Sequence, residues 1–235
     1  MNMKPVEKSR LTPWLSIVAV LGSQLLAVIA IGSLMRVLPA LAYYPQTPIG
    51  TFLISATGGI AAFLTVVLIT RPTSVFDFLT RFKLQLSEDN IRYSFVVFGS
   101  ILGCIGVFVA RLELTNFAKE YVLTKPFIHA NPWGKSLRAI LLLAAPVVEE
   151  IVVRGFVYQS FRQCYSICSS VIAVLLLEII LHWSQMRSAI PVFILLATLQ
   201  IILCLILEKT RNLWNCILFH CAYNGILVIA SVLGF

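Results

Sequence analysis

Charged residues are scarce in this chain of 235 residues: Asp, Glu, Lys and Arg together make up 12% of it, about half the ~25% of an average soluble domain. Hydrophobic residues make up 59%. No polar stretch is long enough to fold around a core of its own, so the composition excludes a separate soluble domain. We expect one integral membrane domain, residues 1–235, built as an all-α polytopic helix bundle.

Short metal and redox motifs are also missing. The six cysteines form no C-x-x-C pair, and the sequence contains no H-E-x-x-H. Because the cysteines lie mainly in or beside apolar runs, we expect free thiols that behave as small hydrophobic residues.

Long apolar runs are what the chain has instead. A transmembrane helix needs about 20 residues, and seven runs approach this length: 14–38, 49–69, 93–110, 136–159, 167–186, 190–207 and 213–235. They predict about seven spans, with the motif-bearing core at approximately 136–235. The fourth and fifth runs carry carboxylates and are the weakest candidates by hydropathy.

Basic residues in the loops indicate the orientation. The first run follows a basic segment, 4–10, and is too long for a signal peptide, so we expect a retained anchor. The loop 71–92 carries four basic residues and the loop 39–48 carries no charge. Because basic loops stay on the cytoplasmic side, we expect the N-terminus in the cytoplasm and the protein in the plasma membrane or another cell membrane. The segment 111–138 holds five basic residues and would lie outside in a seven-span arrangement, which weakens this orientation. An interfacial helix at 117–127 would change the number of spans.

The net charge of +8 suits lipid head groups, because the basic residues lie in short loops beside apolar runs. We therefore expect the bilayer as partner and no nucleic acid. Gly99-x-x-x-Gly103 predicts close approach of a neighbouring helix.

Carboxylates inside membrane-grade segments mark function, because each costs roughly 2.5 to 3.5 kcal/mol at mid-helix on insertion scales. Glu150 and Arg154 are four residues apart, which predicts an ion pair within one helix. Glu149 points about 100° away without a basic neighbour in its own helix, so it is the candidate general base. Pro146 lies one turn upstream and is expected to kink the helix and free a carbonyl near the acid.

Two histidines and an asparagine complete the candidate set. His220 and Asn224 share one face of the last run and offer an imidazole and a carboxamide toward a single point. His182 stands toward the end of the fifth run, where an interface histidine is the simpler interpretation. His129 lies in a polar loop without comparable support, and we set it aside.

These groups suit amide hydrolysis. The acid can take a proton from water as it attacks a carbonyl, and His or Asn donors can stabilise the oxyanion. The same Glu and His residues would alternatively bind Zn²⁺ as three ligands plus water. The sequence leaves the metal question open.

The three motifs resemble those of the CAAX protease and bacteriocin-processing family, also called the ABI family. They are E-E-x-x-x-R at 149–154, His182, and H-x-x-x-N at 220–224, and the resemblance covers roughly 139–225. It implies motifs on the fourth, fifth and seventh helices of an intramembrane protease. It also implies that Glu149 activates water with help from His182, that His220 and Asn224 support the oxyanion, and that Glu150 and Arg154 shape the site.

Glu178 departs from this family pattern, which has an aromatic residue four before the histidine. Glu178 and His182 share a helix face, so the carboxylate is expected to fix the tautomer of the imidazole; the alternative is a drifted, inactive member. His182 also lies nearer the outer side than His220, so the helices must tilt, break or shift for the motifs to meet.

Two functions therefore stand. The first is an intramembrane endopeptidase acting on a membrane-associated peptide or a lipidated protein by a glutamate-type or metal-dependent mechanism. The second is a non-enzymatic immunity factor, scaffold or pseudoprotease, in which the polar residues only tie helices together.

Overall fold

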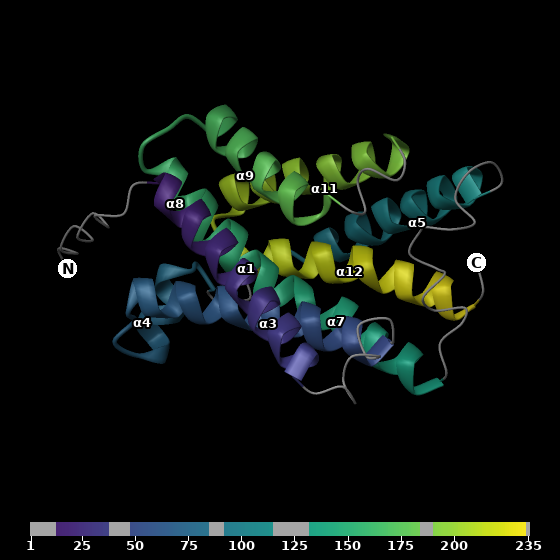
Figure 1. The fold of residues 1–235 in the computed structure, drawn as a ribbon. Coiled ribbons are helices and arrows are strands. Elements are labelled where there is room, and N and C mark those ends of the chain that lie inside the picture. The colour runs from purple at the N-terminus through teal and green to yellow at the C-terminus, as the bar shows by residue number, and fades with distance from the viewer. Residues whose placement is uncertain (1–12, 38–47, 85–91, 115–131, 184–189, 234–235) are drawn as a thin grey trace.

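The structure is a computed structural model that describes residues 13–37, 48–84, 92–114, 132–183 and 190–233. Its described elements are all helical and form a bundle (Figure 1), which confirms the fold class. The loop 39–48 except its last residue, the interfacial helix considered at 117–127 and His129 lie outside the described residues. The elements are α1 (Pro13–Val37), α3 (Pro48–Thr70), α4 (Val75–Arg81), α5 (Ser94–Leu114), α7 (Pro132–Glu150), η3 (Ile151–Tyr158), α8 (Gln159–Arg162), α9 (Ile167–Leu181), α11 (Ile190–Thr210) and α12 (Leu213–Val232).

Each of the seven apolar runs is helical over most of its described length, but seven membrane spans are not confirmed. Three described helices are long and apolar enough to cross a bilayer: α1, α11 and α12. A fourth is reached if α3 and α4, which bend by 100° relative to each other, count as one broken span. The apolar stretches of α5 and α9 are shorter, and the run through α7 and η3 is interrupted by the charges of Glu149, Glu150 and Arg154. These apolar helices show that the chain is an integral membrane protein.

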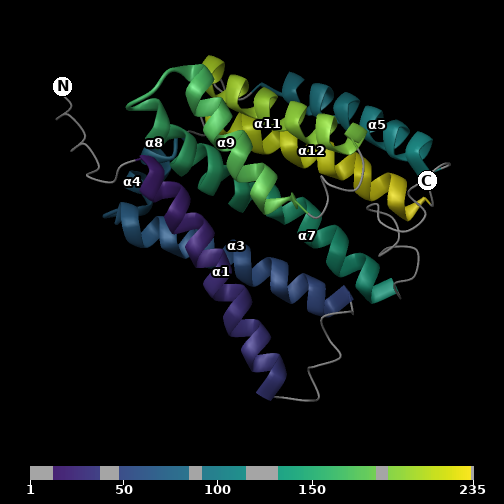
Figure 2. The ribbon, with the colours of Figure 1, turned by 45° about the horizontal axis from the view of Figure 1, so that its top comes forward.

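The segment η3 lies at the centre of the bundle, and all eight of its residues are buried. It is a π-helix that continues directly from α7, and it contacts α1, α3, α9, α11 and α12. Figure 2 shows the surrounding helices, with α1 and α3 on one side and α9, α11 and α12 on the other. Residues that lie on η3 or face it are therefore shielded from the surroundings of the bundle.

Small residues allow the closest helix contact. A Cβ added at Gly103 would lie 2.8 Å from both the Cβ of Ile226 and the carbonyl oxygen of Tyr223, and one added at Gly99 would collide with the carbonyl oxygen of Phe219. The predicted role of Gly99-x-x-x-Gly103 is confirmed: it lets α5 pack directly on the backbone of α12, the helix that carries His220.

The outer faces of the helices carry large apolar side chains, among them Leu26, Leu64, Leu68 and Ile101, which are more than half exposed. In a water-soluble protein such a surface would be unusual. In a bilayer it is the expected contact with lipid, so the polar groups of the interior must satisfy one another.

Candidate active site

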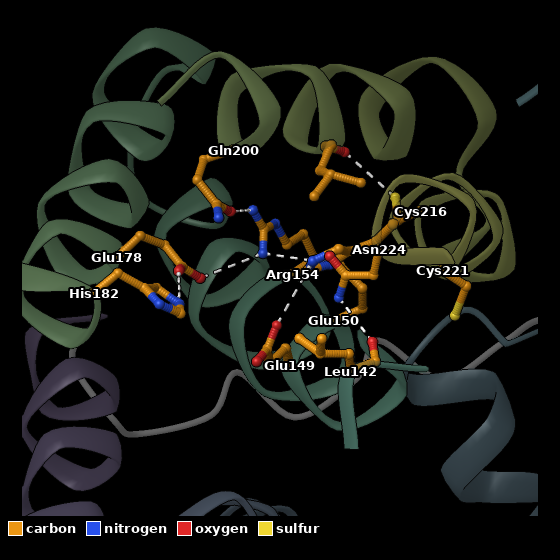
Figure 3. A network of polar contacts seen from close by, with 12 residues as sticks. Leu142, Glu149, Glu150, Arg154, Glu178, His182, Gln200, Cys216, Cys221 and Asn224 are labelled. Atoms are coloured by element: carbon orange, nitrogen blue, oxygen red, sulfur yellow. Dashed lines mark hydrogen bonds and ion pairs between the residues drawn. The ribbon is translucent and has the colours of Figure 1, made fainter. Parts of the chain in front are cut away.

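The polar residues of the three motifs meet where η3 faces α9, α11 and α12 (Figure 3). Glu149 and Glu150 end α7, Arg154 lies on η3, Glu178 lies on α9 and His220 lies on α12. Side chains separated by up to 70 positions in sequence are in direct contact. The site therefore depends on the packing of four helices.

Glu150 holds His220 in place. Both side chains are buried, and the Nδ1 atom of His220 lies 2.8 Å from the Oε1 atom of Glu150. Because Glu150 is paired with the Arg154 guanidinium and an ionised carboxylate only accepts hydrogen bonds, we assign the proton of this contact to Nδ1. The other ring nitrogen, Nε2, is left to face Glu149.

Glu149 is the accessible acid of the pair. Its side chain is 38% exposed, whereas that of Glu150 is fully buried. The Oε2 atom of Glu149 lies 3.8 Å from the Nε2 atom of His220, which is too far for a hydrogen bond. Both atoms therefore keep the capacity to bind a third group, such as a water molecule or a substrate atom.

Arg154 sits between two carboxylates, and its side chain is fully buried. Nη1 lies 3.2 Å from Glu150 Oε1 and 3.4 Å from Glu178 Oε1. Nη2 donates to the carbonyl oxygen of the Gln200 side chain. The predicted pair of Glu150 and Arg154 is present, and the guanidinium joins α7, η3, α9 and α11.

This cluster is not fully satisfied. Among the described residues, Glu150 Oε2 and Arg154 Nε are buried without a hydrogen-bond partner. Because an unsatisfied buried polar atom costs roughly 1 to 3 kcal/mol, the arrangement is costly to maintain. Buried polar groups that are only partly satisfied are more readily explained by function than by stability alone.

Glu178 also holds the motif histidine of α9. The Nε2 atom of His182 lies 3.2 Å from the Oε2 atom of Glu178, and the His182 side chain is 27% exposed against 4% for the acid. The expected contact across one helical turn is therefore present. His182 and Glu149 are the two partly exposed side chains of this network, while the groups between them are buried.

Asn224 has a different partner from His220. Its Nδ2 atom donates to the carbonyl oxygen of Leu142 at 2.8 Å. Leu142 lies four residues before Pro146, which has no N–H to donate to that carbonyl. The side chain on α12 thus replaces the hydrogen bond that the proline removes from α7. The amide has a second N–H that this contact leaves over.

Two features of the site escaped the sequence analysis. Gln200 is an amide within the apolar run of α11, and polar residues inside such runs usually face other protein groups; this signal was available. The π-helical form of η3 had no comparable local signal. Gly155 within it lies so close to Phe82 that an added Cβ would be 2.7 Å from the ring.

The six cysteines are free thiols, as expected. One of them contributes to the α7 contact: Cys221 Sγ lies 3.6 Å from the carbonyl oxygen of Leu143, next to the carbonyl that Asn224 binds.

The metal question can be compared with the positions of the candidate ligands. Within the part of the chain that the structure describes, no group of three or more His, Cys, Asp or Glu side chains is placed to hold a metal ion. The Oε1 atom of Glu150 is shared between His220 and the Arg154 guanidinium, which already supplies positive charge there.

Comparison with known proteins gives one family. The family model described as type II CAAX prenyl endopeptidase Rce1-like matches residues 132–226. This segment contains every residue of the polar network described above. No curated protein and no solved structure matches the chain.

Proposed function

Because residues 132–226 match the family model of Rce1-like type II CAAX prenyl endopeptidases, we propose that this membrane protein hydrolyses a membrane-associated peptide within the bilayer. The observation that carries the proposal is the pairing of Glu149 with His220. A partly exposed carboxylate faces the free nitrogen of an imidazole whose other nitrogen is held by Glu150. Such a pair offers a base and an orienting group at one accessible point.

Glu149 acts as the general base in this proposal. Its carboxylate takes a proton from water, and the water oxygen attacks the carbonyl carbon of the scissile amide. The carbonyl electrons move to oxygen and form an oxyanion. When this intermediate collapses, the C–N bond breaks and the nitrogen leaves with the proton that Glu149 accepted.

His220 and Asn224 are the proposed donors to the oxyanion. The Nε2 atom of His220 donates only when the ring carries both protons, because Nδ1 is committed to Glu150. Asn224 has its second N–H to offer beside the bond to Leu142. Donors that are already fixed before reaction need no reorganisation as charge develops.

His182 is the proposed second proton carrier. Glu178 holds its Nε2 atom and thereby fixes the ring, as carboxylates behind functional histidines do. Glu150 and Arg154 shape the site through the buried contacts that connect α7, η3 and α9. The proposed substrate is a peptide or lipidated protein that reaches the site from the bilayer.

The alternative, a non-enzymatic membrane protein, is favoured by a different observation. The contacts among Glu150, Arg154, Glu178 and Gln200 tie four helices together, and helix association alone would use such contacts. Glu149 separates the two proposals, because it is partly exposed and a purely structural network does not need it.

Glu149→Gln is the decisive variant. It keeps the shape of the side chain and removes the base, so cleavage of a membrane-associated peptide by purified protein should fall by at least ~100-fold. Thermal melting in detergent should stay close to that of the parent. Asp77→Asn on α4 is the matched control, since it neutralises an acid far from the motifs and should retain cleavage. A Glu149→Gln protein as active as its parent would refute the catalytic role.

A further inference from the structure

The bundle also has an apolar groove whose lining includes none of the motif residues. It has a volume of about 320 Å³ and lies between α5, α11 and α12. Both ribbon views place these three helices side by side (Figures 1 and 2). Its lining consists of Phe95, Phe98, Ile101, Leu102, Ile105, Ile202, Ile206 and Phe219.

The groove opens toward the outside of the bundle. Phe98 is 58% exposed and Ile101 51% exposed, and the lining contains only apolar side chains. In a bilayer this surface meets hydrocarbon, so an acyl chain suits it better than a polar ligand does.

The register of the two walls places one end of the groove at a pair of cations. The ribbon views show α5 and α11 running in opposite directions, and a Cβ at Gly106 would lie 3.0 Å from Leu195 Cδ2, so these two positions are level. Phe95 lies eleven residues before Gly106, and Ile206 lies eleven residues after Leu195. These two residues are therefore level with each other as well, and both line the groove. Arg92 lies three residues before Phe95 and Lys209 three residues after Ile206, which is close to one helical turn beyond the groove in each case.

Backbone contacts fix this end. The N–H of Phe95 donates to the carbonyl oxygen of Arg92 at 3.0 Å, and the N–H of Arg92 donates to Asn215 Oδ1 at 2.8 Å. Arg92 therefore stands at the start of α5, beside the first turn of α12. Both Arg92 and Lys209 are exposed.

Neighbouring acids do not neutralise the two cations among the described residues. Glu208 precedes Lys209 but faces η3 and α8, where it accepts from Arg162 Nε at 2.7 Å and from the Tyr158 hydroxyl at 3.1 Å. Within the described parts of the chain, no ion pair involves Arg92 or Lys209. Glu88 and Asp89 lie outside those parts.

We propose that this groove binds an anionic phospholipid of the bilayer, with an acyl chain along α5 and α11 and the headgroup at Arg92 and Lys209. An apolar groove that ends at two cations complements an amphiphile with a negative headgroup. The proposal is independent of the peptidase activity, because the groove lining, Arg92 and Lys209 include none of the residues proposed for catalysis.

Native mass spectrometry of the purified full chain tests this site. The protein in detergent is titrated with phosphatidylglycerol or with phosphatidylcholine of the same acyl chains. We expect one phosphatidylglycerol to be retained in preference to phosphatidylcholine. Arg92→Gln and Lys209→Gln should each weaken phosphatidylglycerol binding by about fivefold, the usual effect of one basic residue at an anionic lipid surface, and leave phosphatidylcholine binding unchanged.

Two further variants make the test specific. Ile202→Trp fills the groove and should weaken binding of both lipids. Arg71→Gln removes an exposed cation that follows α3 on another side of the bundle, so it should change neither. Melting in lipid-free detergent verifies that each variant is folded.

Three results would overturn the proposal. The first is an equal effect of Arg71→Gln, which would mean diffuse attraction. The second is unchanged lipid binding in a folded Ile202→Trp protein. The third is a prenylated peptide that displaces phosphatidylglycerol and that the Ile202→Trp protein no longer cleaves. This result would assign the groove to the substrate.

Discussion

The side-chain amide of Asn224 bonds to the carbonyl oxygen of Leu142 at 2.8 Å, the carbonyl that Pro146 deprives of its helical partner. The bond links α12 to α7 one to two turns before Glu149. The proline position of α7 and the last motif are therefore in direct contact. We expect this bond to position Asn224 and α7 relative to each other.

This contact predicts a non-additive pair of substitutions. Asn224→Ala should lower the free energy of unfolding by about 1 to 2 kcal/mol, because it leaves a part-buried carbonyl without its hydrogen bond. In a Pro146→Ala background the new N–H can bond to Leu142, so the same change should cost much less. Unfolding in mixed detergent with increasing sodium dodecyl sulfate measures both costs.

Asn215→Ala is the control for this cycle. It removes the acceptor of the Arg92 N–H, so its cost should not depend on residue 146. Strictly additive effects of Asn224→Ala and Pro146→Ala would contradict the proposed replacement of one hydrogen bond by another.

Contacts within one helix were predictable from sequence. Glu150 with Arg154 and Glu178 with His182 are each four residues apart, and helical geometry alone brings such side chains together. The carbonyl freed by Pro146 was also predictable, since it follows from the missing N–H of proline.

Contacts between helices were not predictable in the same way. That Asn224 would bind Leu142, or that Gln200 would bind Arg154, depends on the rotation and depth of helices far apart in sequence. The π-helical turns of η3 depend on packing as well, since Gly155 must admit the ring of Phe82. Hydropathy located the apolar runs but did not establish how many cross the membrane, because the charges of α7 and η3 interrupt one run.

Arg154 should be the most sensitive residue for stability. Arg154→Met leaves Glu150 and Glu178 buried without their cation, and breaking a buried pair costs roughly 3 to 5 kcal/mol. The triple variant with Glu150→Gln and Glu178→Gln should recover part of this loss, because it removes the stranded charges. Equilibrium unfolding compares the two proteins.

Arg162→Met provides the comparison for Arg154→Met. It breaks an ion pair with Glu208 at 2.7 Å that is partly exposed, so it should cost no more than about 1 kcal/mol. If Arg154→Met proved as mild as Arg162→Met, the buried guanidinium would not hold the helices together.

Metal dependence has a direct test. Because Arg154 and His220 share the Oε1 atom of Glu150, we expect peptide cleavage to survive removal of metal by a chelator. Elemental analysis of the active protein should find no stoichiometric zinc. About one equivalent of zinc, together with loss of cleavage on chelation and recovery on its return, would reject the metal-free mechanism.

Glu178 provides the last prediction, because it contacts two groups with different functions. Its Oε2 atom lies 3.2 Å from His182 Nε2 and its Oε1 atom lies 3.4 Å from Arg154 Nη1. Glu178→Gln keeps a polar group of the same shape at both contacts, so cleavage should fall by ~10 to 100-fold while the protein stays folded.

Glu178→Phe restores the aromatic residue of the family pattern but removes both contacts. Glu178→Phe should therefore lower both stability and cleavage. Gln200→Leu removes a different partner of Arg154, so it should lower stability and have a smaller effect on cleavage. The pH dependence of kcat separates the two contacts, because only loss of the His182 contact should shift it. A parent without activity and a Glu178→Phe variant that gains it would instead identify the natural chain as a drifted pseudoenzyme and refute the positioning of His182 by Glu178.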